Sequence, residues 1–518
     1  MANDGATTGQ LFDKESTRIE EVLSKQIDTI LPTMDPIWRD TVVSSQGVGS
    51  VSEFSKDFEV NKLYRTGMTG VIEQGAPFDD FFLYGDADTT NLGDRLRKNS
   101  ATNVFPDPMD GPKQKTFRLT VPMRAMYTNL SLTLGEMQMD ATPAVVDSVI
   151  SPILQGFAQN LSHTLCNYWY LSQNTSYKLG TVSATVNNYE ADGTTGEATP
   201  ADVRVVTFKT DEGAYDRFFT GQRVDIYTSD GATRKNEDGS NNRSYAYVES
   251  VDDLAGLVKL RVEKLTGDVV VDGDIIVYAN SGEKPTGAET PAFTGIAGIN
   301  SWLKNSGNLL GSEATTNNTI DVGTHPEFKS FFKSGVGVLT EHKLRQYLRR
   351  FHAAKAKLGQ TIDSLVASDG VWLSYEAQKI GQYQIDRTSN LSNMNNQGSN
   401  EGFAFTFEGR TYKGNTSQYV EDGSVYGVKT SGQNWKRYVP PDYSGLQKMG
   451  EAPSHVPFRF VVPALTGGSS VKFPYLQGTG HQMTEAVQMP GMLRMQLIPD
   501  QPAGLKLTGV TTDTVYGE

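Results

Sequence analysis

Few residues of this sequence combine the type and the spacing that chemistry requires. His163 and Cys166 stand three positions apart, so a helix would place both side chains on one face. Two ligands do not make a tetrahedral zinc site, and a packed core pair is the favoured interpretation. His342 and His352 are ten positions apart, too far along a helix to bind one metal ion.

Other chemical motifs are incomplete or absent from the sequence. Asp86, Asp88 and Asn91 offer oxygen ligands, but the glycine and the glutamate of a calcium loop are misplaced around them. Gly335-Val-Gly337 lacks the third glycine of a dinucleotide-binding loop and is expected to form a turn. There is no phosphate-binding loop and no nucleophile elbow. We therefore predict no catalytic residue, no cofactor, no metal site and no enzymatic activity.

A long helix is the element around which the rest of the chain is arranged. Segment 142–172 opens on Thr-Pro, which suits a helix N-terminus, and its apolar residues roughly follow the helical period. Pro152 interrupts the pattern, so either the first turns are kinked or a second helix restarts at Ser151. We expect Phe157 and Leu161 to lie in the core that this spine helix packs against.

Extended segments precede the spine helix. An apolar stripe over 14–31 predicts a short helix, packed either on its own domain or on a neighbouring subunit. Residues 73–122 hold few aliphatic side chains and end in a strand-like alternation at 115–122. Such a segment is either a disordered loop or a long hairpin. Hairpin arms of about 20 residues would reach about 65 Å, so their tip would rest on a partner.

A module rich in strands and acidic residues follows. Short turn-bounded runs within 180–289 predict a small β-barrel or sandwich; the runs are 203–208, 223–227, 245–248, 257–262 and 274–278. The module carries 20 Asp and Glu against 11 Lys and Arg, a net charge of −9 out of −13 for the chain. Most of the excess negative charge of the protein is therefore concentrated in this module.

The composition bounds the class of protein. A chain of 518 residues is expected to hold two to four domains. Its single cysteine excludes an intrachain disulfide and fits a reducing compartment. There is no run of about 18 apolar residues, so no membrane span is expected, and no signal-peptide pattern is visible. The acidic balance argues against a dedicated nucleic-acid binder, although a local basic face stays open.

Segment 341–358 supplies the clearest local cluster of positive charge. Thr340 is placed to cap a helix whose apolar face holds Leu344, Leu348 and Phe351. The other faces carry basic residues, namely Lys343, Arg345, Arg349, Arg350, Lys355 and Lys357. We interpret them either as a solvated helix face or as a surface that meets nucleic acid or the acidic residues of a neighbouring subunit.

Two short patterns and the order of the parts carry a resemblance to a known family. Asp363-Ser-Leu-Val-Ala-Ser368 with Val371-Trp-Leu373 looks like the strand-to-helix passage of that family, and Phe407-Glu-Gly409 with Gly423-Ser-Val-Tyr426 looks like the strand pair that follows. Together with an arm, a polar hairpin, a long helix and terminal strands, they resemble the major capsid protein of tailed bacteriophages, the Hong Kong 97-type fold that encapsulins share. The length of the chain argues against an encapsulin.

The resemblance implies an α+β fold of the Hong Kong 97 type with an inserted small β-barrel or sandwich domain. The expected parts are an N-terminal arm at 1–72, an extended hairpin loop at 73–122, a peripheral domain with the spine helix at 123–179, an inserted β-domain at 180–289, an axial domain at 290–455, and C-terminal strands that return to the peripheral domain at 456–518.

The same resemblance implies a major capsid protein that self-assembles as hexamers and pentamers into an icosahedral shell. The shell would enclose double-stranded DNA without sequence-specific binding, and the subunits would assemble in the host cytoplasm and reside in the virion, without a membrane. Expected partners are further copies of the chain, a scaffolding protein, a portal and, as an option, a decoration protein. The expected assembly or lumen-facing residues are Arg95, Arg97, Lys98, Arg345, Arg349 and Arg350.

In such a shell the acidic module is expected to face outward, because packaged DNA would repel it at contact distance. Two other functions stay open. Another virion component, such as a tail or baseplate protein, would form rings or tubes instead of closed shells. A β-rich enzyme or carbohydrate-binding protein would use a ligand pocket or a metal in the β-module.

Overall fold

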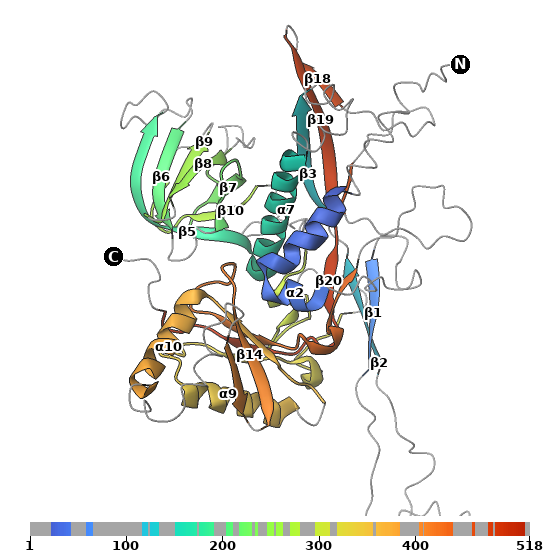
Figure 1. The fold of residues 1–518 in the computed structure, drawn as a ribbon, viewed down its shortest axis with the longest axis vertical. Coiled ribbons are helices and arrows are strands. Elements are labelled where there is room, and N and C mark those ends of the chain that lie inside the picture. Colours follow the sequence, from blue (N-terminus) through green and yellow to red (C-terminus); the bar gives the residue numbers. More distant parts are fainter. Residues whose placement is uncertain are drawn as a thin grey trace, which may run out of the picture. The chain divides into compact units, whose positions relative to one another are not determined.

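A computed structural model describes 20 segments of the chain, which form a mixed α+β structure with several sheets (Figure 1). The segments are 22–42, 59–65, 116–122, 125–133, 151–173, 176–190, 204–210, 217–229, 234–236, 246–252, 255–262, 270–279, 296–310, 319–355, 359–383, 403–407, 409–438, 458–460, 475–479 and 482–512. The chain divides into two compact units, Asn61–Leu119 and the remainder.

The expected long helix is α7 (Ser151–Leu171), whose 21 residues give a rod of about 32 Å. It begins at Ser151 with Pro152 in its first turn, where a missing backbone N–H costs nothing. Residues 142–150 lie outside the described part of the chain. Helical residues 22–34 and α2 (Pro36–Val42) precede it.

The strands of the acidic module close into a barrel. The sheet has seven strands. Their order is β4 (Ser172–Gln173), β5 (Ser176–Glu190), β6 (Arg204–Thr210), β9 (Leu257–Val262), β8 (Ala246–Asp252), β7 (Arg223–Tyr227) and β10 (Ile275–Tyr278). Strand β10 then pairs with the start of β5, with Ile276 opposite Gly180. Because these two strands are the first and last of the module, its two ends lie side by side.

A six-stranded mixed sheet forms the second large element. Its order is β11 (Phe331–Lys333), β21 (Leu505–Leu507), β15 (Val425–Val428), β12 (Ser364–Ala367), β14 (Arg410–Thr416) and β13 (Phe403–Phe407). Helices α9 (Glu341–Lys355) and α10 (Asp369–Tyr383) pack against it through one core that includes Leu348, Trp372 and Tyr412. The strand-to-helix passage predicted at 363–373 is present as β12 followed by α10.

The C-terminal segment supplies strands to more than one sheet. Strand β19 (Gln482–Arg494) pairs with β3 (Ala125–Thr133) over nine positions and also with β17 (Phe458–Phe460) and β18 (Tyr475–Thr479). Strand β20 (Gln496–Pro499) pairs with β16 (Trp435–Tyr438). The segment expected to return to the peripheral domain thus reaches β3, but its last strand, β21, lies inside the six-stranded sheet, where Leu505 and Leu507 join the core.

The remaining short helices are α8 (Ile299–Trp302) and the 3-10 turns η8 (Pro326–Phe328) and η11 (Ser431–Gln433). No helix of the described residues is long and apolar enough to span a membrane.

Candidate assembly surfaces

The base of the expected hairpin is a two-stranded ribbon. Strand β2 (Thr116–Pro122), which the alternation at 115–122 predicted, pairs with β1 (Glu59–Arg65). On β1 the side chains alternate, with Val60, Lys62 and Tyr64 buried and Leu63 54% exposed. The partner strand therefore lies upstream of residue 73, inside the segment that we expected to be arm.

The residues between these two strands carry several of the predicted features. Arg95, Arg97 and Lys98, and the calcium-loop candidates Asp86 and Asp88, lie outside the described residues. What the described strands do establish is that both ends of segment 66–115 are held together by one ribbon.

The spine helix is packed most tightly in its second half. Trp169 contacts two other tryptophans edge-on, with ring centroids 6.1 Å from Trp38 and 5.0 Å from Trp435. Of the two expected core residues, Leu161 is buried at 6% exposure and Phe157 is half-buried. The aromatic cluster was missed from the sequence because its three members come from segments more than a hundred residues apart.

A buried carboxyl group connects this cluster to a distant turn. Asp35 caps α2 by accepting hydrogen bonds from the backbone N–H groups of Ile37 (2.9 Å) and Trp38 (3.3 Å). Its other oxygen accepts the hydroxyl of Ser417 at 2.7 Å. Burial raises the pKa of Asp35 above its ordinary value, and these hydrogen bonds oppose the shift.

Cys166 is buried, and His163 is half-buried among aromatic rings. The His163 ring meets the rings of Phe219 and Tyr419 edge-on, and Asn167 lies 3.1 Å from its Nδ1 atom. Burial raises the pKa of the Cys166 thiol well above its ordinary value. Within the described segments, no group of three or more potential metal ligands comes together.

The β-barrel is joined to the spine helix by a buried polar junction. Asn167 donates to the hydroxyl of Tyr278 (2.8 Å) and to the carbonyl of Arg217 (3.2 Å). The Arg217 guanidinium donates to the carbonyls of Leu179 (3.1 Å) and Val420 (3.3 Å). These contacts attach one end of the barrel to two other parts of the larger unit.

Helix α9, which carries the basic residues of segment 341–358, is amphipathic. The Thr340 hydroxyl accepts the backbone N–H of Lys343 at 3.3 Å, as the sequence predicted for the N-cap. Leu344, Leu348 and Phe351 are buried against the six-stranded sheet. The three arginines expected to mark this surface are all exposed, and they are Arg345, Arg349 and Arg350.

Two of these arginines share an aromatic support. The guanidinium carbons of Arg345 and Arg349 lie 5.4 Å and 5.8 Å from the centroid of the Phe407 ring on β13. This is cation–π geometry, which holds the two guanidinium groups in place on the surface. Arg345 also forms an ion pair with Glu341 one turn earlier. Phe407 was singled out only as part of a strand pattern, and its contact with these arginines was not predicted, because the placement of β13 beside this helix face depends on the tertiary fold.

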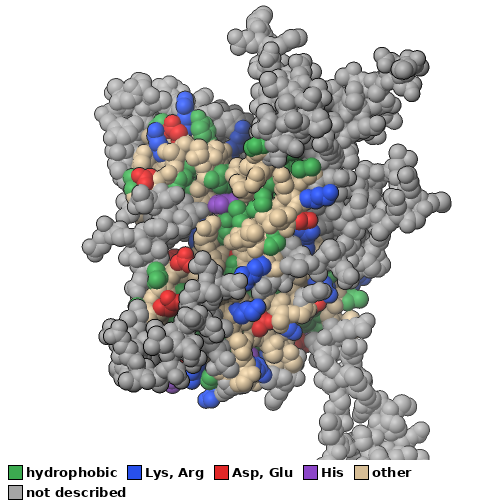
Figure 2. Space-filling view, viewed as in Figure 1, with side chains coloured by type: hydrophobic (Ala, Val, Ile, Leu, Met, Phe, Trp, Pro, Cys, Tyr) green, Lys and Arg blue, Asp and Glu red, His purple; other side chains and the backbone are tan. Residues whose placement is uncertain are grey.

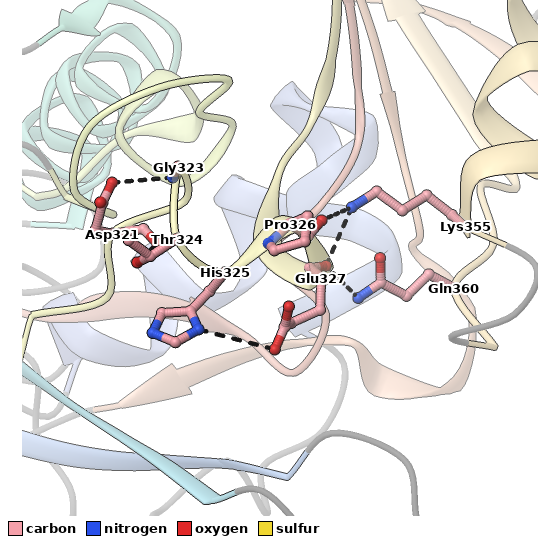
Figure 3. A network of polar contacts seen from close by, with 8 residues as sticks. All are labelled: Asp321, Gly323, Thr324, His325, Pro326, Glu327, Lys355 and Gln360. Carbon is pink, nitrogen blue, oxygen red and sulfur yellow. Dashed lines mark hydrogen bonds and ion pairs between the residues drawn. The ribbon is translucent and has the colours of Figure 1, made fainter. Parts of the chain in front are cut away.

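Two lysines that the sequence placed in the basic cluster bind backbone carbonyl groups instead. Lys343 donates to the carbonyls of Val336 and Val338, both at 2.9 Å. Lys355 turns inward and donates to the carbonyls of Pro326 (2.6 Å) and Glu327 (3.2 Å), as Figure 3 shows. Burial lowers the pKa of Lys355 to about 8, with the charge of Glu327 opposing the shift. These lysines anchor the helix and do not extend its charged face.

The face of the molecule drawn in Figure 2 shows mixed charge among the described residues. On the face drawn in Figure 2, the basic, acidic and apolar side chains of the described residues are interspersed, with no broad patch of one sign. The described side chains on this face therefore do not form a broad basic surface.

Comparison with known proteins identifies solved structures to which this chain is similar. No protein-family model and no curated protein matches the sequence. Among solved structures, the chain is similar to the cyanophage A-1(L) capsid asymmetric unit, with 10% identity, 88% of this chain and 90% of that chain covered, and a TM-score of 0.36. For the capsid of Myoviridae phage XM1 the identity is 9%, the coverage 89% and 90%, and the TM-score 0.32.

The capsid of Ralstonia phage GP4 is similar in the same way, with 8% identity, 91% of this chain and 89% of that chain covered, and a TM-score of 0.29. Structural neighbours over most of the chain are thus phage capsid proteins. TM-scores of this size carry no argument about function, which the chain's own residues must supply.

Proposed function

We propose that this chain is the major capsid protein of a tailed bacteriophage, assembling as hexamers and pentamers into an icosahedral shell around double-stranded DNA. The observation that carries the proposal is the ribbon of β1 and β2. It holds together the ends of a polar segment at 66–115, and residues Asn61–Leu119 form a unit separate from the rest of the chain. A clamped loop of this length and polarity is suited to reach a neighbouring subunit.

The other parts fit the same role. A shell has to close while resisting internal pressure, so load is shared among many modest contacts between identical subunits. The spine helix and the six-stranded sheet give each subunit a rigid body. The chain's acidic balance suits a container, because tight DNA binding by every subunit would impede packaging and release. A scaffolding protein, a portal and a decoration protein are the partners that this role would require or accept.

The acidic barrel belongs to the proposal as an inserted domain on the outer surface. Its ends meet where β10 pairs with β5, as an insertion into a continuous fold requires. Outward placement avoids the repulsion that a module of net charge −9 would meet beside DNA. A density map of the assembled particle would show the barrel outside the shell, and a barrel on the inner surface would contradict the placement.

Deletion of residues 80–112 tests the central claim. The expected product is a soluble, folded subunit that does not form shells, because the clamped loop no longer reaches its neighbour. Negative-stain microscopy of the expressed protein, alone and with a scaffold encoded beside it, gives the readout, and circular dichroism checks the fold.

Shells of normal size from the deletion variant would contradict the role of the loop. Rings or tubes from the intact chain would instead favour a tail or baseplate component.

A further inference from the structure

A third guanidinium group lies near the two arginines that share the Phe407 ring. Arg410 begins β14 and stands directly opposite Phe407 in the antiparallel pair of β13 and β14. Its Nη1 atom contacts Nδ1 of His352 on α9, and its side chain is half-buried. Arg345 and Arg349 of the same helix lie over the Phe407 ring. Three guanidinium groups are therefore gathered where α9 meets the hairpin of β13 and β14.

The contact with Arg410 requires a neutral His352. A guanidinium group only donates hydrogen bonds, so Nδ1 of His352 accepts from Arg410 and carries no proton. The proton of the ring is then on Nε2, which lies 2.5 Å from the hydroxyl oxygen of Tyr412 and donates to it. His352 and Tyr412 are both buried. The imidazole is therefore a fixed acceptor that holds the Arg410 guanidinium in place.

The other two guanidinium groups are also held close together. Arg345 pairs with Glu341, which is the only acidic residue of α9, and both arginines rest on Phe407. Arg345 and Arg349 are four positions apart, and like charges at this spacing on a helix destabilise it. An anion that binds between the guanidinium groups would relieve this repulsion.

We propose that Arg345, Arg349 and Arg410 form a binding site for the phosphate groups of a nucleic acid. A guanidinium group matches a phosphate through two parallel hydrogen bonds. A nucleic-acid strand presents one phosphate about every 3.4 Å along the helix axis, so a row of phosphates can meet several guanidinium groups at once. On the face drawn in Figure 2, the described acidic side chains are instead interspersed with basic ones. The charge pattern therefore favours a nucleic acid over a second copy of this chain as the occupant.

Three phosphate contacts make a weak, salt-sensitive site. For duplex DNA they correspond to a slope of about −2.7 in a plot of log Kobs against log salt concentration. Such a site meets DNA without holding it tightly, as a container requires. The choice of DNA as the ligand rests on the proposed function. Binding is measured on unassembled subunits, however, so a failure of this site and a failure of shell assembly are distinguishable.

Fluorescence anisotropy of a short labelled DNA duplex with the unassembled full chain tests the site. We expect Arg410→Gln to bind more weakly and to make the salt slope shallower by about one. Arg261→Gln is the matched control, because Arg261 is an exposed arginine on β9 of the barrel, and its slope should equal that of wild type. Equal slopes for wild type and Arg410→Gln would overturn the proposal.

Variants of His352 test its role as the positioning residue. His352→Leu removes the acceptor and should weaken binding about twofold to tenfold, because the freed guanidinium has to be ordered on binding. His352→Asn offers an amide oxygen in place of Nδ1 and should recover most of this loss. In the Arg410→Gln background, His352→Leu should have no further effect. Equal weakening in both backgrounds would overturn the positioning role, since a general loss of structure acts without Arg410.

Competition with poly-glutamate separates the two classes of occupant. We expect poly-glutamate to displace the duplex poorly from wild type. If poly-glutamate binds more tightly than the duplex and loses affinity in Arg410→Gln, the nucleic-acid assignment is wrong and the site fits an acidic protein surface.

Discussion

Helices α7 and α9 differ in how many of their side chains are buried. On α7 the six consecutive residues 165–170 are all buried, so the second half of the helix is enclosed on every side. On α9 buried and exposed positions alternate with the helical period, and the arginines occupy the exposed part. The second half of α7 is therefore enclosed by the fold, whereas α9 keeps one face exposed.

The physical cause is the number of elements that each helix meets. Trp169 of α7 contacts rings from α2 and β16, and Tyr168 stacks on Tyr278 of the barrel at 4.7 Å. Helix α9 packs on one sheet with α10 beside it, so one side stays in solvent. A helix enclosed by several elements tolerates substitution poorly, whereas a one-sided helix tolerates changes on its outer face.

The largest effect is expected from Trp169→Ala. Removing the indole leaves a cavity between Trp38 and Trp435, and such truncations cost about 3–5 kcal/mol. The thermal midpoint of the isolated subunit should fall clearly. Gln346→Ala on the exposed part of α9 is the control and should leave the midpoint within experimental error. Equal midpoints for the two variants would remove the contrast between the helices.

A smaller contrast is expected within α7 itself. Leu161→Ala should cost about 2–5 kcal/mol, because Leu161 is buried, while Phe157→Ala should cost less because Phe157 is half-buried. Paired thermal denaturation of the two variants measures the difference. If Phe157→Ala proves the more damaging, the first half of the helix is packed as tightly as the second.

The sequence predicted well those features that depend on local residue spacing. The apolar stripe of α9, its Thr340 cap and the strands of the barrel were confirmed because each follows from local spacing. The enclosure of the second half of α7 was not predicted, since six consecutive buried residues on a helix follow no helical period. Pairings between distant segments also escaped, including β21 beside β11 and the partners of Lys355, which lie 28 and 29 residues upstream.

The capping carboxyl beside α7 makes the enclosed region sensitive to pH. The pKa of Asp35 is raised in the folded chain, so its favourable contribution is fully present below its unfolded pKa and is lost as pH rises through the folded value. Asp35→Asn keeps an acceptor for the α2 backbone and carries no charge. The variant should therefore gain thermal midpoint relative to wild type as pH rises above about 4.

Parallel thermal scans of the two proteins across this range give the measurement. Ser417→Ala is a useful companion, because it removes one hydrogen bond to Asp35 without changing charge. A difference between wild type and Asp35→Asn that stays constant with pH would show that Asp35 does not titrate in this way.

The smallest effect on stability, and the most specific effect on assembly, is expected from the outer face of α9. Arg350→Gln should change the free energy of unfolding by less than about 0.5 kcal/mol, as exposed positions generally do. Arg349→Gln should cost slightly more, about 0.5–1 kcal/mol, because it loses the contact with the Phe407 ring.

Reversing the charge at Arg345, Arg349 and Arg350 together should therefore leave a folded subunit. If this face meets DNA or the acidic residues of a neighbour, the triple variant should fail in assembly or packaging despite its normal thermal midpoint. Particles that form and fill normally would show that the arginines are only a solvated surface, and the contrast between α7 and α9 would then concern folding alone.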